Sequence, residues 1–239
     1  MNRDSLNEFS NFSPEGRLYQ IEYALEAIRL GATVFGIRSN TGIVLVVEKK
    51  KGSKLIENKS IRKLVTLNNF IGCCISGLTS DGRLCVENIR IFLENNSFLY
   101  NNINDIEICA KKIRGLISSV TFGENGEFYI NRPLGIAFLL CGLDRSGIRL
   151  FLIDPAGNFI EKKLAALGNG HKDAAFILRE GYRNKMKTIE LEKLAMKCIR
   201  VVIENQITEK DLELTVLDAN SKKFLVRSCH EIKIILENI

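Results

Sequence analysis

The chain has 239 residues, of which 46% are hydrophobic and 26% are charged, a composition typical of a globular protein with one large domain or two small ones. It contains no run of eighteen apolar residues, and its first residues lack the apolar core of a secretory signal, so we expect no membrane span and no secretory leader. The formal net charge is +6, but the densest basic segment, residues 48–54, has no interleaved aromatic residues, which argues against a nucleic-acid-binding protein.

The first predicted element is a tight turn followed by a helix. Ser13-Pro14-Glu15-Gly16 fits a type I turn, with proline at the second position and glycine at the fourth. Gly31 stands where a left-handed residue could end the helix. Apolar residues between them recur at spacings of three and four, on one helical face: Leu18, Ile21, Leu25 and Ile28. This narrow apolar stripe suits either the core of the chain's own domain or the surface of a partner.

The rest of the chain alternates between blocks of strands and pairs of helices. The expected strands are 33–38, 43–48, 64–67, 70–76, 135–141, 148–153, 159–162, 214–217 and 224–226. The expected later helices are 80–95, 105–122, 172–185, 189–206 and 231–237. Strands joined by short turns pair antiparallel, and runs such as Ile43–Val47 are apolar on both faces, so both faces of the sheet are covered. The order therefore predicts an α+β fold of two packed antiparallel sheets between helix layers.

The residues alone reveal no catalytic constellation. His171 and His230 have no second histidine or cysteine at metal-ligand spacing. Ile75-Ser76-Gly77 lacks the first glycine of a serine hydrolase motif. The segment Leu167-Gly168-Asn169-Gly170-His171 could bind an anion at a helix start, but a close-packed turn is the favoured interpretation. Lys63, just before a predicted strand, is read at this level as a surface lysine.

The seven cysteines give no sign of a metal site or a disulfide framework. No two of them have C-x-x-C spacing, and Cys73 and Cys74 are adjacent in an apolar run. We therefore expect reduced, buried thiols and no metal.

The segment Phe12–Ala24, with the sequence F-S-P-E-G-R-L-Y-Q-I-E-Y-A, is followed by Gly31-Ala32-Thr33 and later by Ser76-Gly77-Leu78. Together these segments resemble the signature of the 20S proteasome alpha subunits. The other segments that fit are Val47–Lys50, Asn58–Lys63, Arg132–Gly135, Asp154–Gly157 and Ala166–Gly168. Two further segments, Glu26–Gly31 and Phe122–Glu124, resemble one of the paralogous alpha types in particular. The resemblance implies a four-layer sandwich of the N-terminal nucleophile hydrolase type, which agrees with the order of elements.

The beta relatives in this family are threonine proteases, whose N-terminal threonine attacks the peptide while its free α-amine serves as the base. In this chain the matching position is Ala32 or Thr33, depending on a one-residue gap, and a mid-chain threonine has only an amide nitrogen. Glu48 stands where the catalytic relatives have an aspartate, although Lys63 matches their lysine. The resemblance therefore implies a non-catalytic subunit without a cofactor. The alternative is a threonine hydrolase of the beta type that removes its own first 31 or 32 residues.

Alpha subunits form a ring that caps the proteolytic beta ring and controls substrate entry in ubiquitin-dependent degradation, in the cytoplasm and the nucleus. The resemblance implies as partners the neighbouring alpha subunits, the beta ring, and the C-terminal tails of regulatory-particle ATPases or other activators, with no nucleic acid and no membrane. It also implies that the apolar stripe of the first helix packs between neighbouring subunits. The positions that match the pocket for activator tails are Glu22, Gly31, Lys63 and Leu78. Those that match gate support are Pro14 and Tyr23.

The N-terminal arm departs from the family pattern. Alpha subunits usually carry Y-D-R about nine residues before the proline, whereas this chain has Ser5-Leu6-Asn7. We expect residues 1–13 to form an atypical gate arm and residues 14–239 to form a single sandwich domain.

Overall fold

The computed structural model describes residues 12–49, 55, 57, 62–100, 105–122, 132–203, 207–219, 221 and 223–238. Ser5-Leu6-Asn7, the basic residues 50–54, residues 58–61 and the pair Gly123-Glu124 lie outside the described residues. The expected gate arm and the expected domain boundary therefore stay predictions.

Within the described residues the strands form two antiparallel sheets of five strands each. The first has the order β10-β9-β2-β1-β8, with bounds Phe224–Val226, Leu212–Asp218, Gly42–Glu48, Val34–Arg38 and Leu164–Leu167. The second has the order β3-β4-β5-β6-β7, with bounds Leu64–Thr66, Ile71–Gly77, Ile136–Asp144, Gly147–Ile153 and Phe159–Glu161. Each pair of neighbouring strands in the two sheets is antiparallel.

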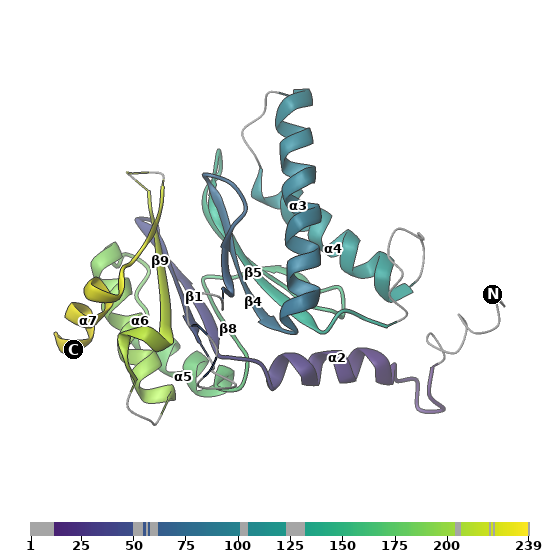
Figure 1. The fold of residues 1–239 in the computed structure, drawn as a ribbon, viewed down its shortest axis with the longest axis horizontal. Coiled ribbons are helices and arrows are strands. Elements are labelled where there is room, and N and C mark those ends of the chain that lie inside the picture. Colours follow the sequence, from purple (N-terminus) through teal and green to yellow (C-terminus); the bar gives the residue numbers. More distant parts are fainter. Residues whose placement is uncertain are drawn as a thin grey trace.

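Helices cover the outer face of each sheet, so the molecule has four layers (Figure 1). On one side lie α5 (His171–Gly181), α6 (Thr188–Val202) and α7 (Cys229–Glu237), and on the other α3 (Thr79–Tyr100) and α4 (Ile106–Phe122). A short 3-10 turn, Glu209–Asp211, precedes β9. Three clusters of buried apolar residues fill the spaces between the layers, one under each helix layer and one between the sheets. These findings confirm the predicted fold class.

The first described helix, α2 (Tyr19–Arg29), lies across one end of the sandwich rather than on a sheet face (Figure 1). The turn before it forms as the sequence predicts, because the amide of Gly16 donates to the carbonyl of Ser13 at 2.8 Å. The helix leads through Gly31 directly into β1, so its C-terminal end is fixed to the first strand. This places α2 beside the start of β1, where the resemblance puts the catalytic position of the beta relatives.

Several predicted boundaries differ from the structure. The strand β8 and the short 3-10 turn were not predicted from the sequence. The predicted helix 172–185 was too long, because α5 ends at Gly181. The strand β8 carries Ala165 and Ala166, which have low strand propensity, but it pairs antiparallel with β1 and this pairing outweighs the propensity. Helix α3 runs further than the predicted 80–95.

Candidate functional site

Thr33, at the entrance to β1, is enclosed and its polar groups are occupied. The residue is 2% exposed, and its peptide N–H donates to the Glu48 carboxylate at 3.0 Å. Its carbonyl accepts from the Glu48 amide at 2.9 Å, and its hydroxyl oxygen accepts from the Gly170 amide at 3.3 Å. The nitrogen at this position is therefore a hydrogen-bonded amide rather than a free amine, and it has no lone pair that accepts a proton at neutral pH.

The turn between β8 and α5 packs directly on the chain beside Thr33. Gly168 has φ +87°, and a Cβ on it would lie 2.1 Å from the carbonyl oxygen of Ala32. The next three amides are all engaged, since Asn169 donates to the Gly31 carbonyl, Gly170 to Thr33 and His171 to the Gly168 carbonyl. The segment 167–171 is therefore a close-packed turn, as the sequence analysis favoured, and its amides are not free to hold an anion.

Gly31 allows close backbone packing and does not form a left-handed cap of α2. Its φ is not positive, unlike that of Gly16, Gly77, Gly147, Gly157 and Gly168, and Leu30 ends the helix with right-handed geometry. The prediction of a left-handed glycine at this position was wrong. A Cβ on Gly31 would lie 2.8 Å from the Gly77 amide nitrogen and 3.0 Å from the Ser76 hydroxyl. A glycine is needed here because two backbone segments cross within contact distance.

The apolar stripe of α2 is buried in the domain only at its C-terminal end and is partly exposed along the rest of the helix. Ile28 is buried, whereas Leu18, Ile21 and Leu25 are half-buried. Ala24 is buried as well, and Ala27 lies near the start of β5, since a Cβ on Gly135 would be 3.4 Å from its methyl group. The C-terminal part of the helix therefore belongs to the chain's own core. Contact between the N-terminal part and a neighbouring subunit stays a prediction.

A short chain of contacts runs from Tyr23, one of the two residues matched to gate support, to Glu15, the sequence neighbour of the other, Pro14. Tyr23 is 64% exposed and its ring stacks on that of Tyr19, with centroids 6.4 Å apart. The Tyr19 hydroxyl donates to the Glu15 carboxylate at 3.4 Å, and Glu15 follows Pro14 in the turn. The exposed aromatic pair thus connects α2 to the turn in front of it.

Three of the four residues matched to the tail pocket converge on the C-terminal end of β4. Leu78 follows this strand and donates its amide to Gly135, Gly31 packs on Gly77, and the Lys63 carbonyl accepts from Ile75 at 2.9 Å. The fourth, Glu22, lies on α2 and forms an ion pair with Arg17 at 2.9 Å. Gly31, Lys63 and Leu78 therefore each lie next to β4 or its C-terminal end, although only Lys63 of the four matched residues lines the pocket beside β3, and the carboxylate of Glu22 is engaged with the residue that follows the first turn.

A buried carboxylate that sequence reasoning did not single out fixes the same end of the molecule. Asp81, in the first turn of α3, is 4% exposed and accepts two hydrogen bonds from Arg132, at 2.7 and 2.9 Å, and one from the Gly135 amide at 3.1 Å. Burial by itself would raise the pKa of Asp81, but the hydrogen bonds from Arg132 and Gly135 hold the pKa below its usual value. The pair fastens α3 to the entrance of β5, and the only sequence signal was Arg132–Gly135 within the family pattern.

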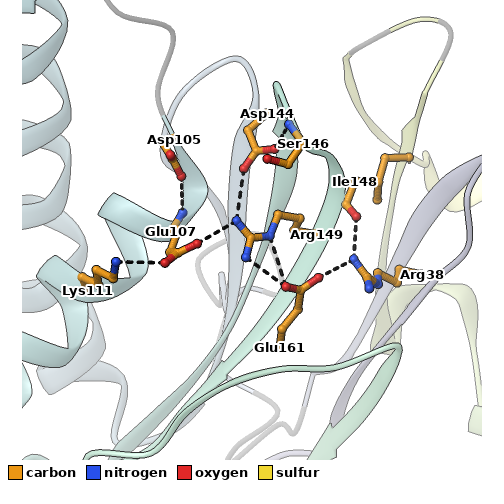
Figure 2. A network of polar contacts seen from close by, with 9 residues as sticks. All are labelled: Arg38, Asp105, Glu107, Lys111, Asp144, Ser146, Ile148, Arg149 and Glu161. Carbon is orange, nitrogen blue, oxygen red and sulfur yellow. Dashed lines mark hydrogen bonds and ion pairs between the residues drawn. The ribbon is translucent and has the colours of Figure 1, made fainter.

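At the other end of the sandwich a network of charges joins the two sheets (Figure 2). Arg149 on β6 binds Glu107 of α4 at 3.0 Å and Glu161 of β7 at 2.9 Å. Glu161 also binds Arg38, at the end of β1 in the other sheet, at 2.7 Å. The pKa of Glu107 lies below its usual value because Lys111 and then Arg149 hydrogen-bond to its carboxylate. No residue of this network was proposed from the sequence.

The cysteines are mostly as expected. All seven are free, and six are buried, but Cys229 at the start of α7 is exposed, contrary to the expectation for that residue. Burial raises the pKa of Cys85, Cys109 and Cys198 to about 12, so these thiols stay protonated at neutral pH. The part of the chain that the structure describes contains no group of three side chains placed to hold a metal ion. None of its helices combines the length and the apolar character needed to cross a membrane.

A four-layer sandwich of two antiparallel sheets between helix layers is the fold of the N-terminal nucleophile hydrolase type. The comparison with known families identifies the member of this fold type: the family model described as "Proteasome subunit" matches residues 28–217, and the chain belongs to this family. A second model, which describes the N-terminal signature of the A-type proteasome subunits, matches residues 9–27, so the chain is of the alpha type.

The named relatives indicate which of the alpha types this chain resembles. The chain is 37% identical over 233 residues to the proteasome alpha type-5 subunit of Dictyostelium discoideum, an alignment that covers 96% of this chain and 95% of that protein. It is 38% identical over 211 residues to the probable proteasome alpha type-5 subunit of Schizosaccharomyces pombe, covering 88% and 85%. The proteasome alpha subunit of Methanopyrus kandleri is 37% identical over 216 residues, covering 90% and 86%. Type-5 is the alpha type that the segment Glu26–Gly31 resembles, so this prediction is confirmed.

Proposed function

We propose that this chain is a non-catalytic subunit of the alpha ring of a 20S proteasome, a scaffold that assembles with neighbouring alpha subunits and the beta ring. The observation that carries the proposal is the hydrogen bond from the Thr33 amide to Glu48. An N-terminal threonine hydrolase needs a free amine in this place to take the proton of its own hydroxyl. An amide that donates to a carboxylate does not perform that step.

The rival function, an autoprocessed threonine hydrolase, would require loss of the first 31 or 32 residues. This cut would remove α2 and with it the buried side chains of Ala24 and Ile28. Fully burying one aliphatic side chain contributes about 1.5–3 kcal/mol, so the cut would cost several kcal/mol of packing at this end of the sandwich. The packing of α2 therefore favours an intact chain.

Mass spectrometry separates the two functions. The chain isolated from its native complex should retain the mass of its α2 segment, and the native complex should have the size of a complete core particle. A chain that begins at Thr33 would support the hydrolase, and a monomer would contradict the ring subunit.

The proposed role of α2 is assembly, supported by the half-buried residues of its stripe and its exposed aromatic face. Replacing Ile21 and Leu25 with aspartate would place charges on the stripe, each costing several kcal/mol if buried in an interface. Ring incorporation should fail while the isolated chain keeps its circular dichroism. Replacing the exposed Glu26 with aspartate is a matched control that should incorporate normally. Unfolding of the isolated Ile21/Leu25 variant would mean that the stripe serves only its own domain.

The same complex would receive activators, and we assign Lys63 to the terminal carboxylate of their tails, with Gly31, Leu78 and Glu22 around it. The positions of Gly31, Lys63 and Leu78 next to β4, and the pocket that Lys63 lines, support this assignment. A charge-assisted hydrogen bond contributes about 1.5–3 kcal/mol, or roughly ten- to 150-fold in affinity. Lys63→Ala should weaken binding of a tail peptide by this factor, and Lys63→Arg should restore only part of it, because a planar guanidinium differs from a compact ammonium group. Unchanged peptide binding by Lys63→Ala would contradict the assignment.

We further infer that Pro14 and Tyr23 support the gate formed by residues 1–13, and that the complex acts in ubiquitin-dependent degradation in the cytoplasm and the nucleus. The contact chain from Tyr23 through Tyr19 to Glu15 supports the first part, since it joins the exposed face of α2 to the turn that follows the arm. Tyr23→Ala in an assembled particle should change peptide entry without changing hydrolysis by a particle whose gate has been opened by deletion of residues 1–11. Equal effects in both particles would contradict a role in the gate.

A further inference from the structure

A groove runs between the edge strand β3 and the first three turns of α3, and it extends beyond the single lysine discussed above. Its volume is about 270 Å³. This is slightly below the range of pockets that enclose a whole drug-sized ligand, about 300–1,000 Å³. The groove therefore suits the end of a chain or one or two side chains rather than a complete cofactor.

The groove is strongly cationic. Arg62 and Lys63 line it from β3's side, and Arg83 and Arg90 line it from α3, whereas Glu87 is the one carboxylate among the described residues of its lining. Arg83 and Arg90 are seven positions apart, which places both on the same face of the helix.

The arginines of the groove retain donors for a ligand. One nitrogen of Arg90 donates to the Thr66 carbonyl at 2.8 Å, which fixes its guanidinium at the groove. A guanidinium has five N–H donors, so further donors of Arg90 stay available. Within the described ranges, neither Arg62 nor Arg83 forms an ion pair with a carboxylate. The like charges of Arg62 and Arg83, which have no carboxylate partner among the described residues, disfavour each other, and an anionic ligand would relieve this repulsion.

The floor of the groove is apolar. Ile75 and Val86 line it and are each 4% exposed, and the half-buried Val65 lies beside them. An apolar floor under a cationic rim matches a ligand with a hydrocarbon stem and anionic heads. A glutamate side chain next to a terminal carboxylate has this form, whereas a bare inorganic anion would leave the floor without a partner.

We propose that this groove recognises an acidic peptide C-terminus, with Arg83 and Arg90 selecting an acidic side chain in addition to the terminal carboxylate. The inference rests on the proposed docking function, because Lys63 receives the terminal carboxylate in both. It adds a specificity for the partner: among possible tails, those with a glutamate or aspartate close to the C-terminus bind preferentially here.

Fluorescently labelled peptides and the purified full chain test the proposal. Four peptides of one sequence are compared, with glutamate or glutamine next to the last residue, and with a free or an amidated C-terminus. The glutamate peptide should bind about tenfold more tightly than the glutamine peptide, the lower end of the range for one charge-assisted hydrogen bond at a partly exposed site. Arg83→Gln, which keeps the contact of Arg90 with β3, should remove most of this preference. Arg114→Gln on the neighbouring helix α4 removes the same charge from an exposed position and should leave the preference intact.

The outcomes separate this inference from the proposed docking function. If free and amidated peptides bind equally while the preference for glutamate persists, the assignment of Lys63 fails and the role of Arg83 stands. If glutamate and glutamine peptides bind equally to the unmodified chain, or Arg114→Gln lowers the preference as much as Arg83→Gln, the acidic specificity is overturned. Competition by an equimolar single-stranded oligonucleotide would likewise overturn it, because the groove would then bind polyanions in general. Thermal unfolding of each variant checks that the fold is retained.

Discussion

At the α2 end of the sandwich, peptide groups from distant segments touch each other, whereas at the opposite end charged side chains span the two sheets. Gly168 contacts the carbonyl of Ala32, and Gly31 contacts Gly77, with no room for a methyl group at either. At the other end Arg149 and Glu161 join α4, β6 and β1 through side chains of different lengths (Figure 2).

The difference has consequences for both stability and function. Close backbone contacts leave little room for movement and do not depend on salt, whereas ion pairs that reach the solvent adjust their geometry and are partly screened. The position that corresponds to the nucleophile of the beta relatives lies at the rigid end. In this chain that position, Thr33, is enclosed by backbone packing.

The largest effect is expected for Gly168→Ala. The new methyl group would meet the Ala32 carbonyl at 2.1 Å, and φ +87° is strained for alanine. The atoms that the methyl group would meet belong to the backbone of Ala32 and Thr33, which cannot move aside as the end of a flexible side chain could. We therefore expect a loss of at least about 3 kcal/mol in the free energy of unfolding, measured by urea denaturation of the full chain.

Gly157→Ala is the matched control for this substitution. Gly157 has a similar φ, +83°, but a Cβ on it meets nothing within 4 Å. It should cost only about 1 kcal/mol, the strain of the backbone conformation alone. Equal losses for the two variants would mean that the contact with Ala32 is not what makes this end rigid.

The second prediction concerns pH and the pair Asp81–Arg132. Because the pKa of Asp81 is lower in the folded state than its usual value of 3.8, the ionised pair stabilises the fold above that pH. This contribution is lost as the pH falls through the folded pKa. Arg132→Gln should cost about 2 kcal/mol at neutral pH, less than for a fully buried pair because Arg132 is half exposed.

The same variant should also move the onset of acid unfolding to higher pH, since a buried carboxylate without its arginine has a raised pKa. Stability measured by chemical denaturation from pH 3 to pH 7 tests this shift, and the exposed Arg179→Gln serves as the control. If acid unfolding begins at the same pH in Arg132→Gln and the unmodified chain, Asp81 is not held by Arg132 in solution.

For the charged end we expect a smaller and salt-dependent effect. Arg149→Met keeps an unbranched apolar side chain but removes the ion pairs with Glu107 and Glu161 and the cation–π contact of the guanidinium with Phe151. The expected loss is about 1–2 kcal/mol at low salt, because Arg149 is only 17% exposed, and it should shrink at 1 M salt. Lys111→Met removes a more exposed pair and should cost about 0.3–0.5 kcal/mol. If the loss in the free energy of unfolding of Arg149→Met does not change with salt, packing rather than charge stabilises this end too.

The sequence predicted the fold well because its signals are local. The spacing of Leu18, Ile21, Leu25 and Ile28 indicated a helix, and proline and glycine in Ser13–Gly16 marked the turn before it, which the structure contains. The strand β8 was missed because Ala165 and Ala166 have no strand preference of their own, and only pairing with β1 makes them a strand.

The contacts of the candidate site were less predictable. The enclosure of Thr33 depends on Gly168 and Gly170, more than 130 positions further along the chain, and Asp81 is paired with a residue 51 positions away. Gly31 was misread because a glycine after a helix suggests a left-handed cap, whereas the space it leaves for Gly77 is visible only in three dimensions. The resemblance identified Lys63 by position, but the arginines beside it come together only when α3 packs against β3.

Apart from the control substitutions, the smallest effect is expected for Thr33 itself, and this residue tests most directly whether the α2 end serves packing or chemistry. If this end is held by backbone contacts, the side chain of Thr33 contributes one hydrogen bond, from the Gly170 amide at 3.3 Å. Thr33→Ala should then cost about 0.5–1.5 kcal/mol in the free energy of unfolding, while Thr33→Ser, which keeps the hydroxyl, should cost less.

Incorporated into a core particle, both variants should leave the rate of peptide hydrolysis unchanged, because the amide nitrogen at this position donates to Glu48 and cannot act as the base for a nucleophile. Hydrolysis is compared at equal particle concentration, with intact mass confirming that the chain is uncut. A fall in hydrolysis for Thr33→Ala but not for Thr33→Ser, with normal assembly, would show that the hydroxyl takes part in catalysis, and the proposal of a non-catalytic subunit would be wrong.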